Sequence, residues 1–119
     1  MMTSALLKAL MDEGCPVESS LAETFMGNET LYERLLRKLA QTNDIAKMEQ
    51  ACAAGDANAC FEAGHALKGV YATLALRPLH ERCAAIVDVA RKGSLEGMDT
   101  ALPELKALHE HFLEIIATH

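Results

Sequence analysis

The chain has 119 residues, a length that corresponds to one domain with one hydrophobic core. Its formal net charge of -6 and pI near 5.3 exclude the clustered basic surface that nucleic-acid binding needs. Half of the residues are apolar, but only three Phe, two Tyr and no Trp are present, so a core must consist mainly of aliphatic side chains. Such a composition suits packed helices and does not suggest a β-sandwich.

In chain order, the first elements are short. Residues 4–12 have the spacing of an amphipathic helix that ends before Pro16. A second short helix, residues 17–26, follows. Asn28 is then placed to cap a third helix.

Residues 29–54 contain neither Gly nor Pro, and their apolar positions drift only slowly around a helical wheel. They therefore predict one long helix, with Glu33 and Arg37 at the favourable i, i+4 spacing on its solvated face. The cluster Thr42-Asn43-Asp44 could instead cap a new helix and bend or break the long one.

Gly55 is expected to end this segment, and Asp56 or Asn58 is expected to cap the next helix, which runs to about Ala75. Apolar residues in this helix recur at three- and four-residue spacing, which predicts one buried stripe. The stripe consists of Cys60, Ala63, Leu67, Val70 and Leu74.

Two more helices complete the chain. One begins at Pro78, which suits a first helical turn, and ends at Gly93. The last segment runs from about Leu95 to Ala117; helix onset near Thr100 would place Pro103 in the first turn, whereas an earlier start predicts a kink. These lengths and short turns predict an all-α fold, an antiparallel up-and-down four-helix bundle capped by the two short N-terminal helices.

The four cysteines, Cys15, Cys52, Cys60 and Cys83, form no C-x-x-C pair, and three of them fall on apolar helical stripes. We expect reduced core residues, not a disulfide or zinc framework, and hence a reducing compartment. The N-terminal run MMTSALLK lacks a charged leader region and soon meets Asp12, so it is expected to be neither a signal peptide nor a membrane span. The predicted location is the cytoplasm.

The most informative stretch is the run AGHALKG around His65. At about 100° per residue, Lys68 and Gly69 share a helix face with His65, whereas Leu67 points to the opposite side. Gly64 and Gly69 each cost about 1 kcal/mol relative to Ala within a helix, which favours close approach by another molecule. Close packing against a neighbouring helix is the alternative for each glycine.

The pattern His65-x-x-Lys68-Gly69, followed by Ala72, Leu74 and Leu76, resembles the signature of histidine-containing phosphotransfer (HPt) domains. The run FMGNETLYERLL resembles the family's entry into its first long helix, and AAGD at 53–56 resembles the turn before its histidine helix. The resemblance covers about residues 20–117 of a single domain, 1–119. The sequence departs from the family at Ala75, where Gly often stands ten residues after the histidine.

The resemblance implies a phosphorelay intermediate in two-component signal transduction. His65 is expected to accept a phosphoryl group from an aspartate of one receiver domain and to pass it to another, while Lys68 stabilises the phosphate charge. Gly64, Gly69 and Ala72 would keep the surface around the imidazole low for a partner, and Phe61 is expected to belong to the same partner surface. The implied partners are response-regulator receiver domains and a hybrid sensor histidine kinase.

The chain has no phosphate-cradling Gly-rich loop and no nucleotide-binding motif, so a phosphoryl carrier without kinase activity of its own is expected. No cofactor is expected on this chain, because the magnesium ion that stabilises the transferred charge would belong to the receiver domain. The expected protein is a free-standing monomer that binds neither nucleic acid nor membrane.

Two alternatives remain. One is an HPt-like adaptor bundle that docks on receiver domains without carrying phosphate. The other is a small metal or cofactor binder that uses His109, His111 and cysteines. His109 falls near an apolar stripe and is expected to be buried and hydrogen-bonded, and His111 lies on a different helix face, so the pair lacks the i, i+4 spacing of a helical metal site. His80 and His119 are expected to lie on the surface.

Overall fold

The structure, a computed structural model, describes residues 4–119. All of its regular elements in this range are helices, and the all-α prediction is confirmed for the part of the chain described. The elements are α1 (Ser4–Asp12), α2 (Val17–Glu23), α3 (Glu29–Arg37), the 3-10 helix η1 (Lys38–Gln41), α4 (Asp44–Ala53), α5 (Ala57–Thr73), α6 (Arg77–Arg91) and α7 (Met98–Thr118).

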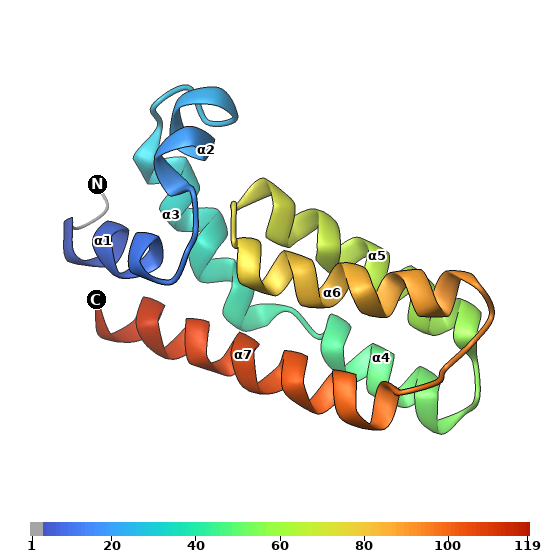
Figure 1. Cartoon of the computed structure of the whole chain (residues 1–119). Coiled ribbons are helices and arrows are strands. Elements are labelled where there is room, and N and C mark those ends of the chain that lie inside the picture. Colours follow the sequence, from blue (N-terminus) through green and yellow to red (C-terminus); the bar gives the residue numbers. More distant parts are fainter. Residues whose placement is uncertain (1–3) are drawn as a thin grey trace.

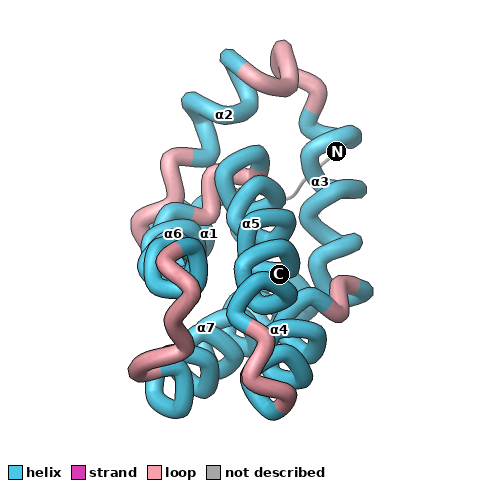
Figure 2. Tube along the Cα trace, turned by 90° about the vertical axis from the view of Figure 1, so that its right-hand side faces the viewer, coloured by secondary structure: helices cyan, strands magenta, loops and turns pink. Residues whose placement is uncertain are grey.

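Four helices, α4 to α7, lie side by side along the long dimension of the molecule (Figure 1). Helix α5 packs against α4 and α6, and α7 packs against the same two helices, so each of the four contacts two neighbours. Figure 2 views this group nearly end-on and shows α3 beside it and α2 above it. The two short N-terminal helices, α1 and α2, lie at one end of the group (Figure 1).

The prediction of one continuous helix over residues 29–54 is wrong. Helix α3 ends at Arg37, one 3-10 turn follows, and Thr42 takes an extended conformation with φ -71° and ψ 140°. The backbone N–H of Asp44 donates to the Thr42 hydroxyl at 3.4 Å, and that hydroxyl donates to the Asp44 carboxylate at 3.1 Å. These local bonds compete with helical backbone bonds, which is why the polar cluster breaks the helix.

The last helix takes the earlier of the two starts that the sequence allowed. Helix α7 begins at Met98, two residues before Thr100 and directly after Gly97, whose φ of 77° lies in the left-handed region. Pro103 is therefore inside the helix and beyond its first turn. Since Pro103 has no N–H, the carbonyl of Asp99 lacks its helical donor, and Asp99 lies on the exposed side of the helix, where water can replace it.

The core is aliphatic around a few aromatic residues. Tyr32, Tyr71 and Phe112 are the largest fully buried side chains. The Tyr32 hydroxyl donates to the carbonyl of Leu74 at 2.7 Å, which ties α3 to the end of α5. All four cysteines are free thiols; Cys60 and Cys83 are buried as their helical stripes predict, Cys15 is buried outside any helix, and Cys52 is only partly buried.

Helix α5 ends in a tight turn at Ala75, although Ala stands where the HPt family often has Gly. Ala75 has φ 56°, and its N–H donates to the carbonyl of Ala72 at 3.1 Å. The N–H of Leu76 donates to the carbonyl of Tyr71 at 3.0 Å, which completes a Schellman motif. The departure from Gly therefore leaves the turn intact but places an alanine in left-handed backbone.

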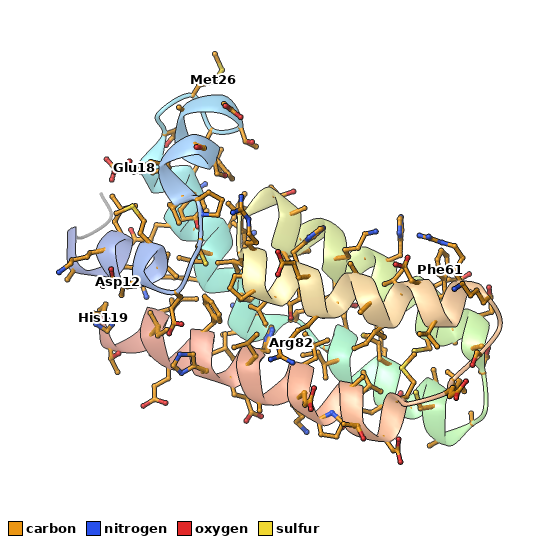
Figure 3. All side chains as sticks on the ribbon, in the orientation of Figure 1. Asp12, Glu18, Met26, Phe61, Arg82 and His119 are labelled. Carbon is orange, nitrogen blue, oxygen red and sulfur yellow. The ribbon has the colours of Figure 1, made fainter. Side chains whose placement is uncertain are left out.

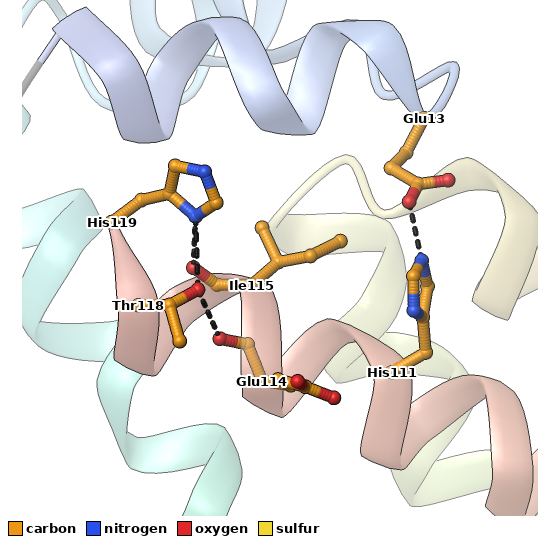
Figure 4. A network of polar contacts seen from close by, with 6 residues as sticks. All are labelled: Glu13, His111, Glu114, Ile115, Thr118 and His119. Carbon is orange, nitrogen blue, oxygen red and sulfur yellow. Dashed lines mark hydrogen bonds and ion pairs between the residues drawn. The ribbon is translucent and has the colours of Figure 1, made fainter.

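Helix α1 packs against α7 near the C-terminus. The His111 ring on α7 contacts the carboxylate of Glu13, which directly follows α1 (Figure 4). A guanidinium N–H of Arg37 donates to the carbonyl of Ile116 on α7 at 3.2 Å, and the same side chain pairs with Glu33 at 3.1 Å, as its i, i+4 spacing predicts. Among the described helices, none is long and apolar enough to cross a membrane.

Candidate functional site

Helix α5 carries the residues of the sequence motif. It begins after Asp56, whose carboxylate accepts from the backbone N–H of Ala59 at 3.0 Å, so Asp56 and not Asn58 is the cap. Cys60 and Leu67 are buried with no exposed surface and fix which side of the helix faces the core. On the helical wheel, His65 lies roughly opposite Cys60 and Leu67. The packing that buries those two residues therefore leaves the histidine exposed.

His65 is exposed, as predicted. Within residues 4–119, neither of its ring nitrogens takes part in a hydrogen bond or ion pair. Its one ring contact is with Phe61, with centroids 5.6 Å apart and planes inclined by 17°. Both nitrogens are therefore open to solvent and to an incoming molecule.

Lys68, one helical turn after His65, is half-buried. It has no ion-pair partner among the described residues. Burial raises the pKa of the Cys83 thiol on α6 to about 12, and the positive charge of Lys68 acts against that shift. No carboxylate of the described residues lies within ion-pair distance of the Lys68 ammonium group.

The surface after His65 is open. A Cβ atom added to Gly69 would meet no heavy atom within 4 Å, and Ala72 is exposed. Gly69 and Ala72 thus leave room beside the imidazole on this part of α5.

The expectation that Gly64 belongs to the same partner surface is wrong. Gly64 is buried, and an added Cβ would lie 3.0 Å from Cγ2 of Val87 and 3.2 Å from Cε of Met48. The Cys83 thiol donates to the carbonyl of Gly64 at 3.3 Å. Gly64 therefore allows α4 and α6 to approach α5 closely, which is the packing alternative.

The prediction that Val70 belongs to the buried stripe is also wrong, because Val70 is 39% exposed. It lines an open, mostly apolar groove of about 570 Å³ between α5 and the α3–η1 segment. Leu35 and Lys38 line the groove opposite Ala66 and Gly69, so it begins beside the histidine. The periodicity of α5 could not reveal this groove, because its other wall is formed by α3 and η1, which precede the helix break at Thr42.

The other histidines do not form a second site. His109 is 6% exposed, and its Nδ1 lies 2.7 Å from the Tyr71 hydroxyl, in agreement with its predicted buried and hydrogen-bonded state. Burial lowers the pKa of His109 below its ordinary value. His111 is exposed beside Glu13, and His119 bonds to the carbonyl of Ile115 at 2.9 Å (Figure 4). In residues 4–119, no three His, Cys, Asp or Glu side chains are grouped so that they could hold a metal ion.

These features define a class: a small all-helical module with an exposed, unpaired histidine and a free lysine one turn away on the same helix. The sequence matches the Hpt domain family over residues 31–115, which is more than half of the chain, and the protein belongs to this family. Hpt domains are phosphocarrier modules that act in histidine phosphotransfer with receiver domains of two-component systems. No curated protein and no solved structure matches the chain.

Proposed function

We propose that His65 is the phosphoacceptor of this protein and that it takes a phosphoryl group from the aspartate of one receiver domain and delivers it to another. The observation that carries the proposal is the state of His65: exposed, with both ring nitrogens free of intramolecular partners, within the family match. None of the other four histidines lies on α5, and His109 is buried.

The transfer step needs only a neutral imidazole. The lone pair of its unprotonated nitrogen attacks the phosphorus of the aspartyl phosphate in line with the P–O bond to the carboxylate. A P–N bond forms, that P–O bond breaks, and the carboxylate leaves with the bonding electrons. The proton on the other ring nitrogen stays where it is. Delivery to the second receiver is the reverse step with a new aspartate.

Lys68 stabilises the phosphoryl group in this proposal. An ammonium group on a flexible stem, three residues after the histidine, can follow the phosphate oxygens as a mobile point charge. Its lack of an ion-pair partner in the described chain supports this role, because no carboxylate has to be displaced first.

The partner surface in this proposal consists of Phe61, Gly69 and Ala72, together with the groove edge at Val70. Small residues after the histidine give a receiver's active-site loops room to reach the imidazole, and the apolar groove beside them offers area to bury. A hybrid sensor histidine kinase and a response regulator would supply the two receivers. The magnesium ion would come with the receiver, and this chain would act in the cytoplasm as a monomeric carrier without kinase activity, built on an antiparallel four-helix arrangement of α4 to α7.

The test is incubation with a receiver domain phosphorylated at its aspartate. We expect label on this chain that is labile in acid and stable in base, as a phosphorus–nitrogen bond requires. His65→Gln should reduce labelling to background while changing the free energy of unfolding by less than about 1 kcal/mol, because the site is exposed. His80→Gln is the matched control and should still be labelled.

Two results would contradict the proposal. If His65→Gln is labelled as well as the wild type, another histidine is the acceptor. If the wild type binds the receiver but is never labelled, the protein is an adaptor.

A further inference from the structure

A chain of side-chain contacts leads from helix α6 to His65. The Arg91 guanidinium pairs with Asp88 at 3.1 Å and lies over the Phe61 ring, 5.6 Å from its centroid. The Phe61 ring in turn stacks on the imidazole of His65, with centroids 5.6 Å apart. We propose that Phe61, held by Arg91, is a positioning residue that fixes the orientation of the His65 imidazole for phosphoryl transfer. This inference rests on the proposed function of His65.

Something must orient the imidazole if transfer is to be fast. In many sites a hydrogen bond to one ring nitrogen holds a functional histidine. His65 has no such bond within the described chain, so the stacking contact is what restricts rotation of its ring. An aromatic contact suits a carrier, because it limits the side-chain torsions while leaving both nitrogens free for phosphorus and proton.

Phe61 is anchored well enough to act in this way. It precedes His65 by four residues on α5, so the two side chains lie one above the other on the same side of the helix. Phe61 is half-buried and packs against the hydrophobic core. In Figure 3 it projects from α5 at the end of the bundle far from α1. The ring is therefore held by its contact with the core while it also stacks on the histidine.

Arg91 supports Phe61 from the side that the core does not cover. Phe61, Asn58 and Gly93 line a hollow of about 230 Å³ together with Ala90 and Arg91, so dense packing does not confine the ring there. The guanidinium over the ring gains a cation–π contact, and its bond to Asp88 holds it in place. This third contact brings α6 into the positioning of a residue on α5.

The experiment compares Phe61→Leu with Phe61→Tyr in the transfer assay. Removing the ring should lower the rate of labelling of His65 by about tenfold, because a misdirected imidazole seldom meets phosphorus in line. Tyr keeps the ring and should restore at least half of the wild-type rate. Phe25→Leu is the control for a general loss of stability: Phe25 is buried in the α2–α3 region, where it packs edge-on against Tyr32, and its loss should leave the rate unchanged.

Proton NMR of the imidazole gives a readout that does not depend on activity. The ring current of Phe61 should displace the His65 carbon-bound proton resonances, and the displacement should vanish in Phe61→Leu and persist in Phe61→Tyr. If the resonances do not change in Phe61→Leu, the stack does not exist in solution and the inference is wrong.

A double-mutant cycle tests the role of Arg91. Arg91→Gln alone should slow labelling about threefold, a smaller effect than loss of the ring, and should have no effect in the Phe61→Leu background if Arg91 acts only through Phe61. An equal effect of Arg91→Gln in both backgrounds would show that Arg91 contacts the phosphoryl group or the partner directly, and would overturn its positioning role.

The outcomes for the proposed function and for this inference can be separated. If the wild type is labelled on His65 and Phe61→Leu is labelled at the same rate, the inference fails and the proposed function stands. If the wild type is not labelled at all, both fail together.

Discussion

Gly64 and Gly69 lie five residues apart on the same helix and have opposite surroundings. A Cβ atom at Gly64 would lie 3.0 Å from Val87, whereas one at Gly69 would meet nothing within 4 Å. The first glycine permits helix packing, and the second leaves the surface beside His65 open. One helix thus uses the same residue type once for its buried side and once for its exposed side.

This relationship predicts opposite effects on stability. Gly69→Ala should raise the free energy of unfolding by up to about 1 kcal/mol, because an exposed helical glycine carries an entropy cost without a packing benefit. Gly64→Ala should leave stability at or below the wild-type level, because overpacking against the stiff Val87 side chain offsets the same gain. Urea denaturation of the two variants checks the difference, which we expect to be about 1 kcal/mol or more. Equal stabilisation by both substitutions would contradict the packing role of Gly64.

A long side chain at Gly69 should affect function and not folding. We expect Gly69→Gln to unfold at the wild-type temperature or above, since the position is open, but to weaken receiver docking and to slow phosphoryl transfer. Thermal melts and a transfer assay on the same preparation measure both effects. A lowered melting temperature would instead place a neighbouring side chain over Gly69.

Loss of the Lys68 charge should slow transfer or shorten the lifetime of the phosphorylated state without abolishing either. The expected effect is about 1 to 2 kcal/mol, the size of one charge-assisted hydrogen bond. Lys68→Arg keeps the charge and should retain most of the activity, and Lys92→Ala, at an exposed lysine directly after α6, should have no effect. Unchanged kinetics of Lys68→Ala in both directions would make Lys68 an ordinary surface residue.

Ala75 predicts a stabilising substitution. Its φ of 56° is costly for a residue with a Cβ atom, by about 1 kcal/mol, whereas glycine adopts it readily. Ala75→Gly should therefore raise the free energy of unfolding by about 0.5 to 1 kcal/mol. Ala85→Gly, in the exposed middle of α6, is the matched control and should lower it by about 1 kcal/mol. A loss of stability in Ala75→Gly would mean that the turn relaxes in solution.

The buried pair of Tyr71 and His109 predicts a pH dependence of stability. Burial lowers the pKa of His109 below the 6.5 of an unfolded histidine, so the unfolded chain binds a proton more readily than the folded one. This contribution to stability is fully present above pH 6.5 and is lost as the pH falls from there toward the folded-state pKa. The slope attributable to His109 can reach about 1.4 kcal/mol per pH unit within that window.

Urea denaturation between pH 7 and pH 5 measures this slope. His109→Gln should flatten it, whereas His80→Gln, outside the core, should leave it unchanged. A slope that survives in His109→Gln would assign the pH dependence to other groups.

The sequence by itself determined the helical class, the cap Asn28 and the exposure of His65, and it narrowed the cap of α5 to Asp56 or Asn58. Each of these depends on local rules: the 3.6-residue period, side-chain oxygens beside free N–H groups, and the choice of helix face by apolar residues such as Leu67. The site motif could be found for the same reason, because His65, Lys68 and Gly69 lie within two turns of one helix.

Only the tertiary structure decided what each residue meets across helices. Gly64 stands at i+4 from Cys60 and i−3 from Leu67, but its contact with Val87 and Met48 exists only after α4, α5 and α6 have packed. Val70 is exposed because it lines the groove between α5 and the α3–η1 segment, which no pattern within α5 reveals. The helix break at Thr42 results from competition between side-chain and backbone hydrogen bonds, and helix propensity alone does not predict which of the two prevails. Arg91 lies 26 positions after His65, and only the packing of α6 on α5 brings it to Phe61.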